Sequence, residues 1–168
     1  MSGDLIARPA SSDAMTRTGA SAEELAVALG RTDCSGRTAT VLGYGPIGQE
    51  YVKALKALRV GRIRVCARSR TRLALLDGHP EVETIAVELG RLECHPEAGE
   101  VGIVALPIGH LAAGARQLAM RGFRRLLIEK PVALQSQEIR QLADDLAQEG
   151  VEAFCAYNRV AYPSFHAV

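Results

Sequence analysis

The sequence contains no tryptophan, and aromatic residues account for only 4% of its 168 positions. A protein that stacks nucleic-acid bases on side-chain rings needs more of them. Positive and negative charges nearly cancel, leaving a net charge of +1, so the chain as a whole is not drawn to nucleic acid or to an anionic membrane. Both shortages argue against nucleic acid as a partner.

Paired cysteines and long apolar runs are also missing. The four cysteines are widely spaced and form no C-x-x-C motif: Cys34, Cys66, Cys94 and Cys155. We therefore expect neither a disulfide framework nor a metal site. No apolar run approaches the roughly 20 residues of a membrane span, and the N-terminus lacks the apolar core of a signal peptide. These absences predict a soluble, cytoplasmic protein that does not enter a membrane.

Residues 1–36 consist largely of Ser, Thr, Ala and Gly. We expect an extension that is mostly disordered, with one short helix capped at Ser21 and ended at Gly30. No function is assigned to it. Residues 37–156 are long enough for one domain with a substantial core.

From Thr38 onward, apolar segments alternate with segments of helical periodicity. The pattern predicts strands over residues 38–42, 62–67, 83–87, 101–106, 125–129 and 151–156. It predicts helices over residues 46–58, 71–76, 109–121 and 136–149, and a connection with a weak helical turn over residues 88–100. The first helix carries apolar residues at helical spacing: Ile47, Tyr51, Val52, Leu55 and Leu58. This alternation indicates an α/β fold with a doubly wound parallel sheet and a ligand at the carboxyl ends of its strands.

The first predicted strand leads directly into a glycine-rich turn with the spacing G-x-G-x-x-G. Such a turn binds the pyrophosphate of a dinucleotide: its glycines allow a tight turn, a close approach of backbone to phosphate, and close packing of helix on strand. The helix that follows offers free N–H groups to the phosphates. An ordinary glycine-rich surface turn is the alternative. The candidate cofactor residues are Gly43, Tyr44, Gly45, Pro46, Ile47 and Gly48.

The end of the second predicted strand distinguishes between the two nicotinamide cofactors. An NAD site usually has an acidic residue there, which binds the ribose 2′-hydroxyl. This sequence has Arg68, Ser69 and Arg70 instead, with no carboxylate in reach. Two guanidinium groups and a hydroxyl suit a 2′-phosphate, so we expect NADP(H) rather than NAD(H). A solvated basic loop is the alternative.

The loop after the fourth predicted strand carries Leu106, Pro107 and His110. In a doubly wound sheet this loop lies over the cofactor crevice, and His110 would stand at the start of the next helix. A capping or surface histidine is the alternative interpretation.

Glu129, Lys130 and Pro131 follow the apolar part of the fifth predicted strand. A charged pair at this position fits the mouth of a site better than a core. Lys130 could donate a hydrogen bond to a substrate oxygen as hydride leaves or arrives. Pro131 restricts the backbone of Lys130, and the bond between them could be cis. Without the glycine turn, Lys130 would be taken for a solvated lysine.

Four segments occur in the order in which a known family has them: GYGPIG, ALPIGH, IEKP and AYNRVAYPSF. From about Thr38 to Val168 the sequence resembles the N-terminal half of the Gfo/Idh/MocA oxidoreductases, relatives of glucose–fructose oxidoreductase and inositol dehydrogenase. The E-K-P segment is the most specific element of the resemblance.

The resemblance implies a Rossmann domain that binds NAD(P)(H) in an enzyme acting on CH–OH groups of sugars, inositols, sugar nucleotides or related compounds. It implies that Lys130 is the catalytic residue near the nicotinamide and the substrate's reacting oxygen. Glu129 and the turn at Leu106 and Pro107 would line the nicotinamide end. Asn158, in the segment that leads out of the domain, is counted with the cofactor residues.

The family continues into an α+β domain that supplies the substrate pocket, a second catalytic acid or base and the oligomer interface. Because the sequence stops at Val168, we expect residues 157–168 to be the lead-in to a second domain that is absent, and His166 there has no recognisable catalytic partner. The first interpretation is an NADP-dependent oxidoreductase for a sugar-like substrate, completed by a homo-oligomer or a partner chain. The alternatives are a stand-alone NADP(H)-binding module or sensor, an inactive fragment, and a domain that has lost its ligand.

Overall fold

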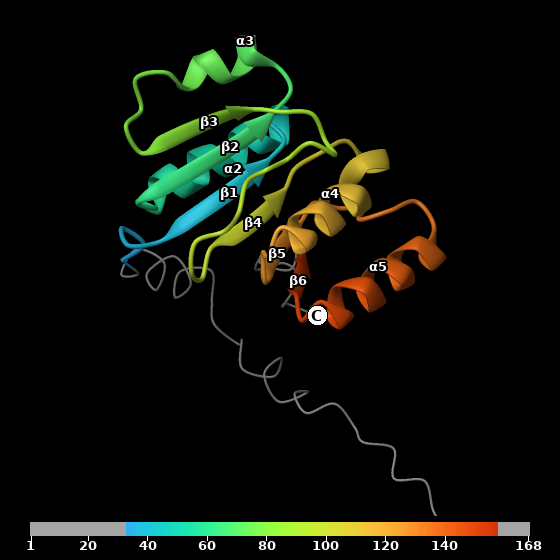
Figure 1. Ribbon diagram of the computed structural model, residues 1–168. Helices are drawn as coiled ribbons and strands as arrows, with labels where there is room; N and C mark the ends of the chain where they lie inside the picture. The colour runs from blue at the N-terminus through green and yellow to red at the C-terminus, as the bar shows by residue number, and fades with distance from the viewer. Residues whose placement is uncertain (1–32, 158–168) are drawn as a thin grey trace, which may run out of the picture.

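The structure, a computed structural model, describes residues 33–157 of the chain (Figure 1). The helix predicted between Ser21 and Gly30 lies outside the described residues, as do Asn158 and His166. None of the described helices has the length and hydropathy needed to span a bilayer.

Six parallel strands form one sheet in the order β3-β2-β1-β4-β5-β6. The strands are β1 (Thr38–Leu42), β2 (Arg62–Ala67), β3 (Val82–Ala86), β4 (Val101–Val104), β5 (Arg125–Ile128) and β6 (Glu152–Cys155). The chain runs outward from the centre of the sheet in one direction and then in the other, which is the strand order of the Rossmann fold. The predicted doubly wound parallel sheet is therefore confirmed.

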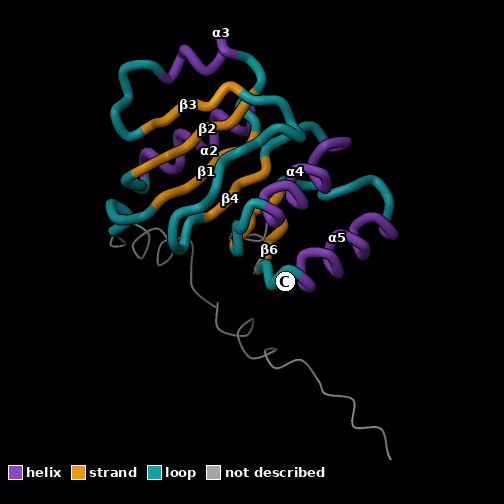
Figure 2. The backbone as a smooth tube through the Cα atoms, viewed as in Figure 1, coloured by secondary structure: helices purple, strands orange, loops and turns teal. Residues whose placement is uncertain are grey.

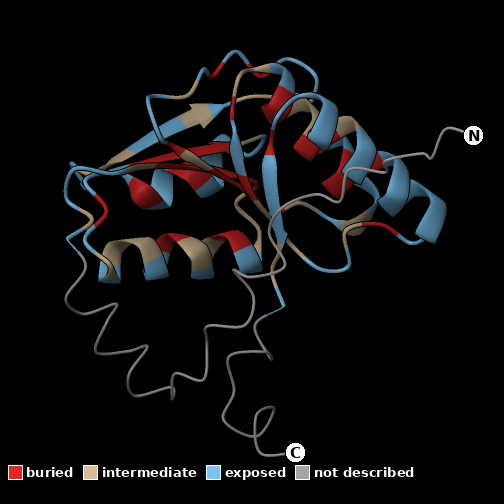
Figure 3. Cartoon of the chain, turned by 90° about the horizontal axis from the view of Figure 1, so that it is seen from below, coloured by how far each residue is buried: buried red, intermediate tan, exposed pale blue. Residues whose placement is uncertain are grey.

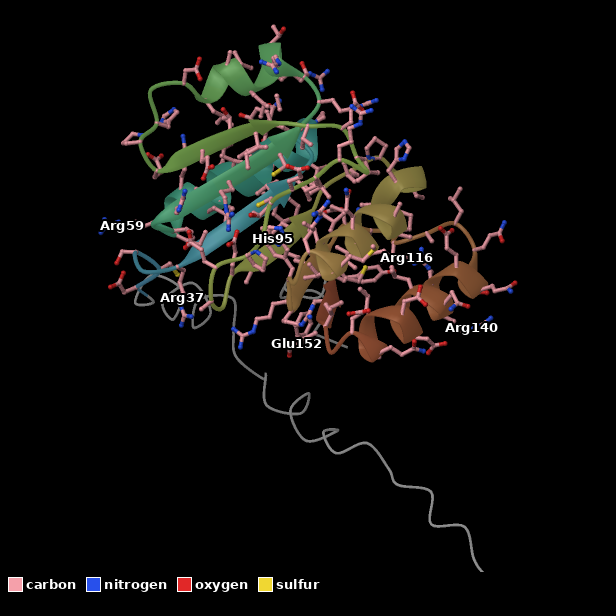
Figure 4. All side chains as sticks on the ribbon, in the orientation of Figure 1. Arg37, Arg59, His95, Arg116, Arg140 and Glu152 are labelled. Atoms are coloured by element: carbon pink, nitrogen blue, oxygen red, sulfur yellow. The ribbon has the colours of Figure 1, made fainter. Side chains whose placement is uncertain are left out.

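The connections contain all four predicted helices (Figure 2). They are α2 (Pro46–Ala57), α3 (Arg70–Leu73) with the 3-10 helix η1 (Ala74–Leu76), α4 (Ile108–Met120) and α5 (Ser136–Gln148). An ion pair of 2.7 Å between Arg116 and Asp145 joins α4 to α5. Arg116 is labelled in Figure 4. Because all six strands are parallel, the loops after β1, β2, β4 and β5 lie at one edge of the sheet.

The prediction of a weak helical turn within residues 88–100 is wrong. The connection between β3 and β4 contains no helix. Its glycines Gly90 and Gly99 have φ values of 95° and 76°, which a right-handed helix does not accommodate. Between them, Leu92 and Cys94 are buried while their neighbours are exposed, so this segment lies extended across the sheet.

Each face of the sheet has its own apolar core (Figure 3). Val41 and Val65 face α2, α3 and η1, whereas Leu42 and Val104 face α4, α5 and the connection between β3 and β4. Because both faces are covered, the central strands β1, β2 and β4 are buried along most of their length, as is typical of parallel strands.

Candidate functional site

Gly43 and Gly48 build the turn between β1 and α2, and neither could carry a side chain. Gly43 has a φ of 107°, and a Cβ there would lie 2.3 Å from the carbonyl oxygen of Ala105. A Cβ on Gly48 would lie 2.1 Å from the carbonyl oxygen of Gly43, so α2 packs directly on the turn. The N–H of Gly43 also donates a hydrogen bond of 2.8 Å to the carbonyl oxygen of Cys66. This bond fixes the turn beside the end of β2.

Gly45 differs from these two glycines because the space in front of it is open. A Cβ on Gly45 would meet no heavy atom of the described chain within 4 Å. Gly45 is the N-cap of α2, and among the described residues no side chain caps the helix and no acidic residue stands in its first turn. Pro46 has no N–H, and the N–H groups of Ile47 and Gly48 have no acceptor within residues 33–157. The turn therefore fits a phosphate, with room for it and N–H groups to bind it.

Tyr44 and Ile47 complete the turn. Tyr44 is half-buried, and its burial raises the pKa of its phenol. Ile47 is 49% exposed although the helical spacing groups it with Val52, which is 2% exposed. Ile47 stands in the first turn of α2, just past the glycine turn. It leaves an exposed apolar side chain next to the turn.

Arg68, Ser69 and Arg70 follow β2 and are exposed. The hydroxyl oxygen of Ser69 accepts a hydrogen bond of 3.3 Å from the backbone N–H of Arg72 and caps the short helix α3. The proton of that hydroxyl stays available to a ligand. Neither Arg68 nor Arg70 takes part in an ion pair within residues 33–157. Two exposed guanidinium groups and a hydroxyl are therefore carried by the loop after β2, whose first end adjoins the glycine turn through the bond between Gly43 and Cys66.

The loop after β4 closes over the glycine turn from the other side. The backbone N–H of Ala105 donates a hydrogen bond of 2.8 Å to Leu42 at the end of β1. Leu106 is half-buried and Pro107 is exposed as the N-cap of α4. His110 lies in the first turn of this helix, as predicted, with its side chain exposed. Its backbone N–H donates to the carbonyl oxygen of Pro107 at 2.8 Å.

Glu129 and Lys130 follow β5, and the Lys130–Pro131 peptide bond is cis. Glu129 is half-buried, and its Oε2 accepts a hydrogen bond of 3.1 Å from the backbone N–H of Lys130. The side chain of Lys130 is exposed at the edge of the sheet. The carboxylate therefore holds the backbone of the lysine, while the ammonium group stays open to a ligand.

Tyr51 belongs to this site, although the sequence placed it among the apolar positions of α2. Its hydroxyl donates a hydrogen bond of 2.7 Å to Oε1 of Glu129. Burial, and then the hydrogen bond to Glu129, raise the pKa of Tyr51 far above its usual value. The phenol therefore remains a donor at every physiological pH. A tyrosine at an apolar helical position was the only sequence signal, since its polar end needs a partner when buried.

Hydrogen bonds between backbone groups assemble these loops at one edge of the sheet. They join the turn after β1 to the end of β2, the loop after β4 to the end of β1, and Glu129 to Val104 at 3.0 Å. The predicted site residues of residues 33–157 are thereby brought to the carboxyl edge, where Rossmann domains bind dinucleotides. Asn158 lies outside the described residues. No group of metal-binding side chains occurs within the part of the chain that the structure describes.

No family model and no curated protein matches the sequence. Solved structures do match the fold. The protein yvaA from Bacillus subtilis, whose oxidoreductase assignment is itself provisional, is 25% identical with a TM-score of 0.64 over 77% of this chain and 37% of its own. Scyllo-inositol dehydrogenase from Lactobacillus casei, with bound NAD(H) and scyllo-inositol, is 14% identical with a TM-score of 0.67 over 77% and 38%.

The WlbA dehydrogenase from Chromobacterium violaceum, in complex with NADH and UDP-GlcNAcA, is 17% identical with a TM-score of 0.58 over 71% of this chain and 34% of its own. The chain thus spans less than two fifths of the length of these structures. Residues 33–157 form a Rossmann domain of the type found in the N-terminal part of the Gfo/Idh/MocA oxidoreductases.

Proposed function

We propose that this domain binds NADP(H) and forms the cofactor half of an oxidoreductase site. The reaction is hydride transfer to or from a CH–OH or carbonyl carbon of a sugar, a sugar nucleotide or a related compound. The observation that carries the proposal is the open space at Gly45, which faces the uncapped N-terminus of α2. Gly43 and Gly48 are glycines because the protein itself leaves them no room, whereas Gly45 is free of protein contacts on its Cβ side. A ligand explains that glycine.

The pyrophosphate would lie against Gly45 and the N–H groups of Ile47 and Gly48. These donors and the helix dipole favour a negative charge at this end of α2. No acidic side chain of the described residues stands in the first turn to oppose it. The apolar side chain of Ile47 would then cover one side of the bound dinucleotide.

Arg68, Ser69 and Arg70 support NADP(H) over NAD(H). The loop that carries them adjoins the glycine turn through the bond between Gly43 and Cys66, which is where the adenosine ribose of a Rossmann-bound dinucleotide lies. Guanidinium groups bind a phosphate through paired, charge-assisted hydrogen bonds. Two of the similar structures contain NAD(H) or NADH, so this preference would set the chain apart from them.

Lys130 is the proposed catalytic residue. When bound, the nicotinamide supplies or accepts the hydride. The exposed ammonium group of Lys130 would donate a hydrogen bond to the substrate oxygen and stabilise the negative charge that develops there. Glu129 holds the backbone of Lys130, and Tyr51 holds Glu129, so the ammonium group leaves the sheet at a fixed place.

A sugar-like substrate is proposed from the similar structures. One contains scyllo-inositol and another UDP-GlcNAcA, both of which present ring hydroxyl groups. An exposed lysine beside the nicotinamide would donate a hydrogen bond to the oxygen of such a hydroxyl group. A module that binds NADP(H) without catalysis remains the second interpretation, and it predicts the same cofactor binding without turnover.

Fluorescence titration with NADPH and with NADH tests the proposal. We expect both to bind and NADPH to bind more tightly. Replacing Arg68 or Arg70 with alanine should weaken the binding of NADPH roughly tenfold, which is the effect expected from losing a charge-assisted hydrogen bond. The binding of NADH should stay nearly unchanged. Arg140→Ala is the matched control, because Arg140 is an exposed arginine on α5, away from the site (Figure 4).

If the folded chain binds neither dinucleotide, the proposed function is wrong. If NADH binds more tightly than NADPH, only the role of the two arginines is wrong. Equal losses of affinity in the Arg68, Arg70 and Arg140 variants would mean that net charge, and not a phosphate site, causes the preference.

A further inference from the structure

One side of the sheet is only partly covered within residues 33–157. The apolar core on the side of α2 contains buried residues of β1, β2 and β4, but from β5 only the half-buried Leu127 and from β6 none. Helices α4 and α5 pack on the opposite side of the sheet, against the other core (Figure 1). In the part of the chain that the structure describes, β5 and β6 therefore have no covering helix on the α2 side.

Phe154 of β6 points to this side of the sheet. It is paired with Leu127 in the parallel ladder between β5 and β6, and paired residues of neighbouring strands point to the same face. Leu127 belongs to the core on the α2 side, so Phe154 does too by its direction, yet it is 59% exposed. A large aromatic ring is thus left in solvent next to a half-buried leucine.

Helix α2 borders the same side with a row of half-buried apolar residues. Tyr51, Leu55 and Leu58 follow one another at spacings of four and three residues, so they lie along one side of the helix. The hydrogen bond from Tyr51 to Glu129, directly after β5, shows that this side of α2 faces β5. All three pack against the core without being fully buried. We call the following five residues the open face: Tyr51, Leu55, Leu58, Leu127 and Phe154.

The chain enters its described part beside the end of this row. The carbonyl oxygen of Cys34 accepts a hydrogen bond of 3.1 Å from the N–H of Gly61, three residues after Leu58. Cys34 is itself half-buried against the same core. A segment that precedes Asp33 therefore meets the open face at the edge of the sheet where β5 and β6 begin. Glu152, labelled in Figure 4, stands at that end of β6.

Residues 21–30 have the sequence pattern of a helix with one apolar side. Ser21 and Glu24 form a capping box, and Gly30 ends the helical pattern. Such a helix is about 15 Å long, close to the roughly 13 Å of a strand as long as β5 or β6. The apolar side consists of positions i, i+3, i+4 and i+7, which are Ala22, Leu25, Ala26 and Leu29.

We propose that residues 21–30 form a helix that packs on the open face beside α2, with Leu25 and Leu29 against Leu127 and Phe154. The helix runs from the carboxyl edge of the sheet to the amino edge, as α2 does. It covers the side of the sheet that α2 alone leaves exposed, and it buries the ring of Phe154. The inference does not depend on the proposed function.

The length of the connection and the charge at its end agree with this placement. When extended, the residues from Gly30 to Cys34 span up to about 13 Å, enough to cross the two strand spacings of about 5 Å between β1 and β5. Arg31, just past the helix, would reach the amino end of β6. The side chain of Glu152 there is 61% exposed and lies 3.8 Å from Arg125, so it is open to a second guanidinium group.

Two other occupants fit the open face less well. Residues 158–168 follow β6, but Pro163 interrupts a helical pattern in their middle. A second copy of the chain would need a larger surface, because a standard interface takes roughly 20 to 30 residues from each partner and the open face has five apolar ones. The segment that enters at Cys34 has both the matching length and the matching apolar side.

The sequence has no tryptophan, so Phe154→Trp in the full chain places a unique fluorescent reporter on the open face. We expect the emission of a buried indole with weak quenching by acrylamide. Adding Leu25→Asp and Leu29→Asp should shift the emission to longer wavelengths and increase the quenching severalfold. Val27→Asp, on the opposite side of the helix, is the matched control and should change neither. Equal emission and quenching with and without the two leucines would overturn the proposal.

The same reporter identifies the other occupants. Burial of the indole that depends on protein concentration would indicate a second copy of the chain. Burial that survives the loss of Leu25 and Leu29 but disappears in a Phe165→Asp variant would indicate residues 158–168. Either result would overturn the assignment to residues 21–30.

Hydrogen exchange in the chain without the reporter gives a second readout. A helix this short is marginal in water by itself, so protection of its N–H groups requires docking. The N–H groups of residues 25–30 should exchange severalfold more slowly in the wild type than in a Phe154→Asp variant. Met120→Asp, at an 80% exposed position on α4, is the control and should leave the exchange unchanged. Equal exchange in the wild type and the Phe154 variant would overturn the proposal.

Discussion

The hydroxyl of Tyr51 donates a hydrogen bond of 2.7 Å to Oε1 of Glu129, two residues that are 78 positions apart in the sequence. The bond ties α2, which begins at the glycine turn, to the loop that carries Lys130. It is the one side-chain hydrogen bond between these two parts of the proposed site within residues 33–157. The cofactor helix and the proposed catalytic lysine are therefore linked by a single tyrosine.

Tyr51→Phe should destabilise the chain by about 1 kcal/mol, because a half-buried carboxylate loses one of its donors while the ring keeps its packing. Urea unfolding measures this. The matched control is Tyr44→Phe, since Tyr44 is also half-buried at the same edge but has no hydrogen bond from its hydroxyl among the described residues. Equal effects in the two variants would mean that the bond to Glu129 contributes nothing.

Stability should also fall in alkali because of Tyr51. The pKa of this phenol is raised in the folded chain, first by burial and then by Glu129, above its ordinary value of 10.0. Between these two pKa values the unfolded chain has lost a proton that the folded chain keeps, so stability decreases as the pH rises above about 10. Unfolding curves from pH 8 upward should decline more steeply for the wild type than for Tyr51→Phe. Parallel curves would show that Tyr51 is not protected from ionisation.

Arg64 on β2 forms a buried ion pair with Glu100, in which its Nε lies 3.2 Å from Oε1 of the carboxylate. Arg64→Met should cost about 3–5 kcal/mol, because Glu100 would be left buried without its partner. Arg62→Met is the control on the same strand. Arg62 pairs with Glu83 at 2.8 Å and with Glu97 at 2.7 Å, but its side chain is 52% exposed, so its loss should cost no more than about 1 kcal/mol. Guanidinium chloride unfolding compares the two variants.

Adding Glu100→Leu to Arg64→Met should restore much of the lost stability, since the unpaired charge is removed. If Arg64→Met costs no more than Arg62→Met, Arg64 and Glu100 do not form a stabilising buried ion pair. The double variant also checks that the cost comes from the stranded carboxylate and not from lost packing of the arginine.

Lys130→Ala should reduce NADP-linked turnover about 100-fold or more, as expected when a donor to a developing oxyanion is removed. The affinity for NADPH should change by less than about twofold, which corresponds to under 0.5 kcal/mol. Turnover is measured with polyol and sugar substrates, and affinity by fluorescence titration. Lys53→Ala, an exposed lysine on α2, is the control. Unchanged turnover in the Lys130 variant would make this lysine a bystander.

The fold could be predicted because its signals are local. The alternation of apolar strands and helices located all six strands, and the spacing of Gly43, Gly45 and Gly48 located the turn. The ends of elements were less accurate. The fourth strand ends at Val104 and not at Leu106, because Ala105 bonds back to the end of β1 and the chain turns toward Gly43.

The features that the sequence did not predict depend on tertiary contacts. Tyr51 has the spacing of an apolar helical residue, and its partner Glu129 comes from a distant strand. Arg64 looks like one member of an alternating strand, and Glu100 lies 36 positions away. A charged residue in a strand normally faces water, so only the folded connection between β3 and β4 shows that Arg64 is buried.

The most direct test of the central claim is a calorimetric titration of the wild type and Gly45→Ala with NADPH. Because a Cβ at Gly45 meets no atom of the described chain, the variant should fold with a stability within about 1 kcal/mol of the wild type. The added methyl group would occupy the space of the pyrophosphate and weaken binding at least about tenfold, or 1.4 kcal/mol. A folded wild type that binds no NADPH, or a Gly45→Ala variant that binds it as tightly as the wild type does, would contradict the account.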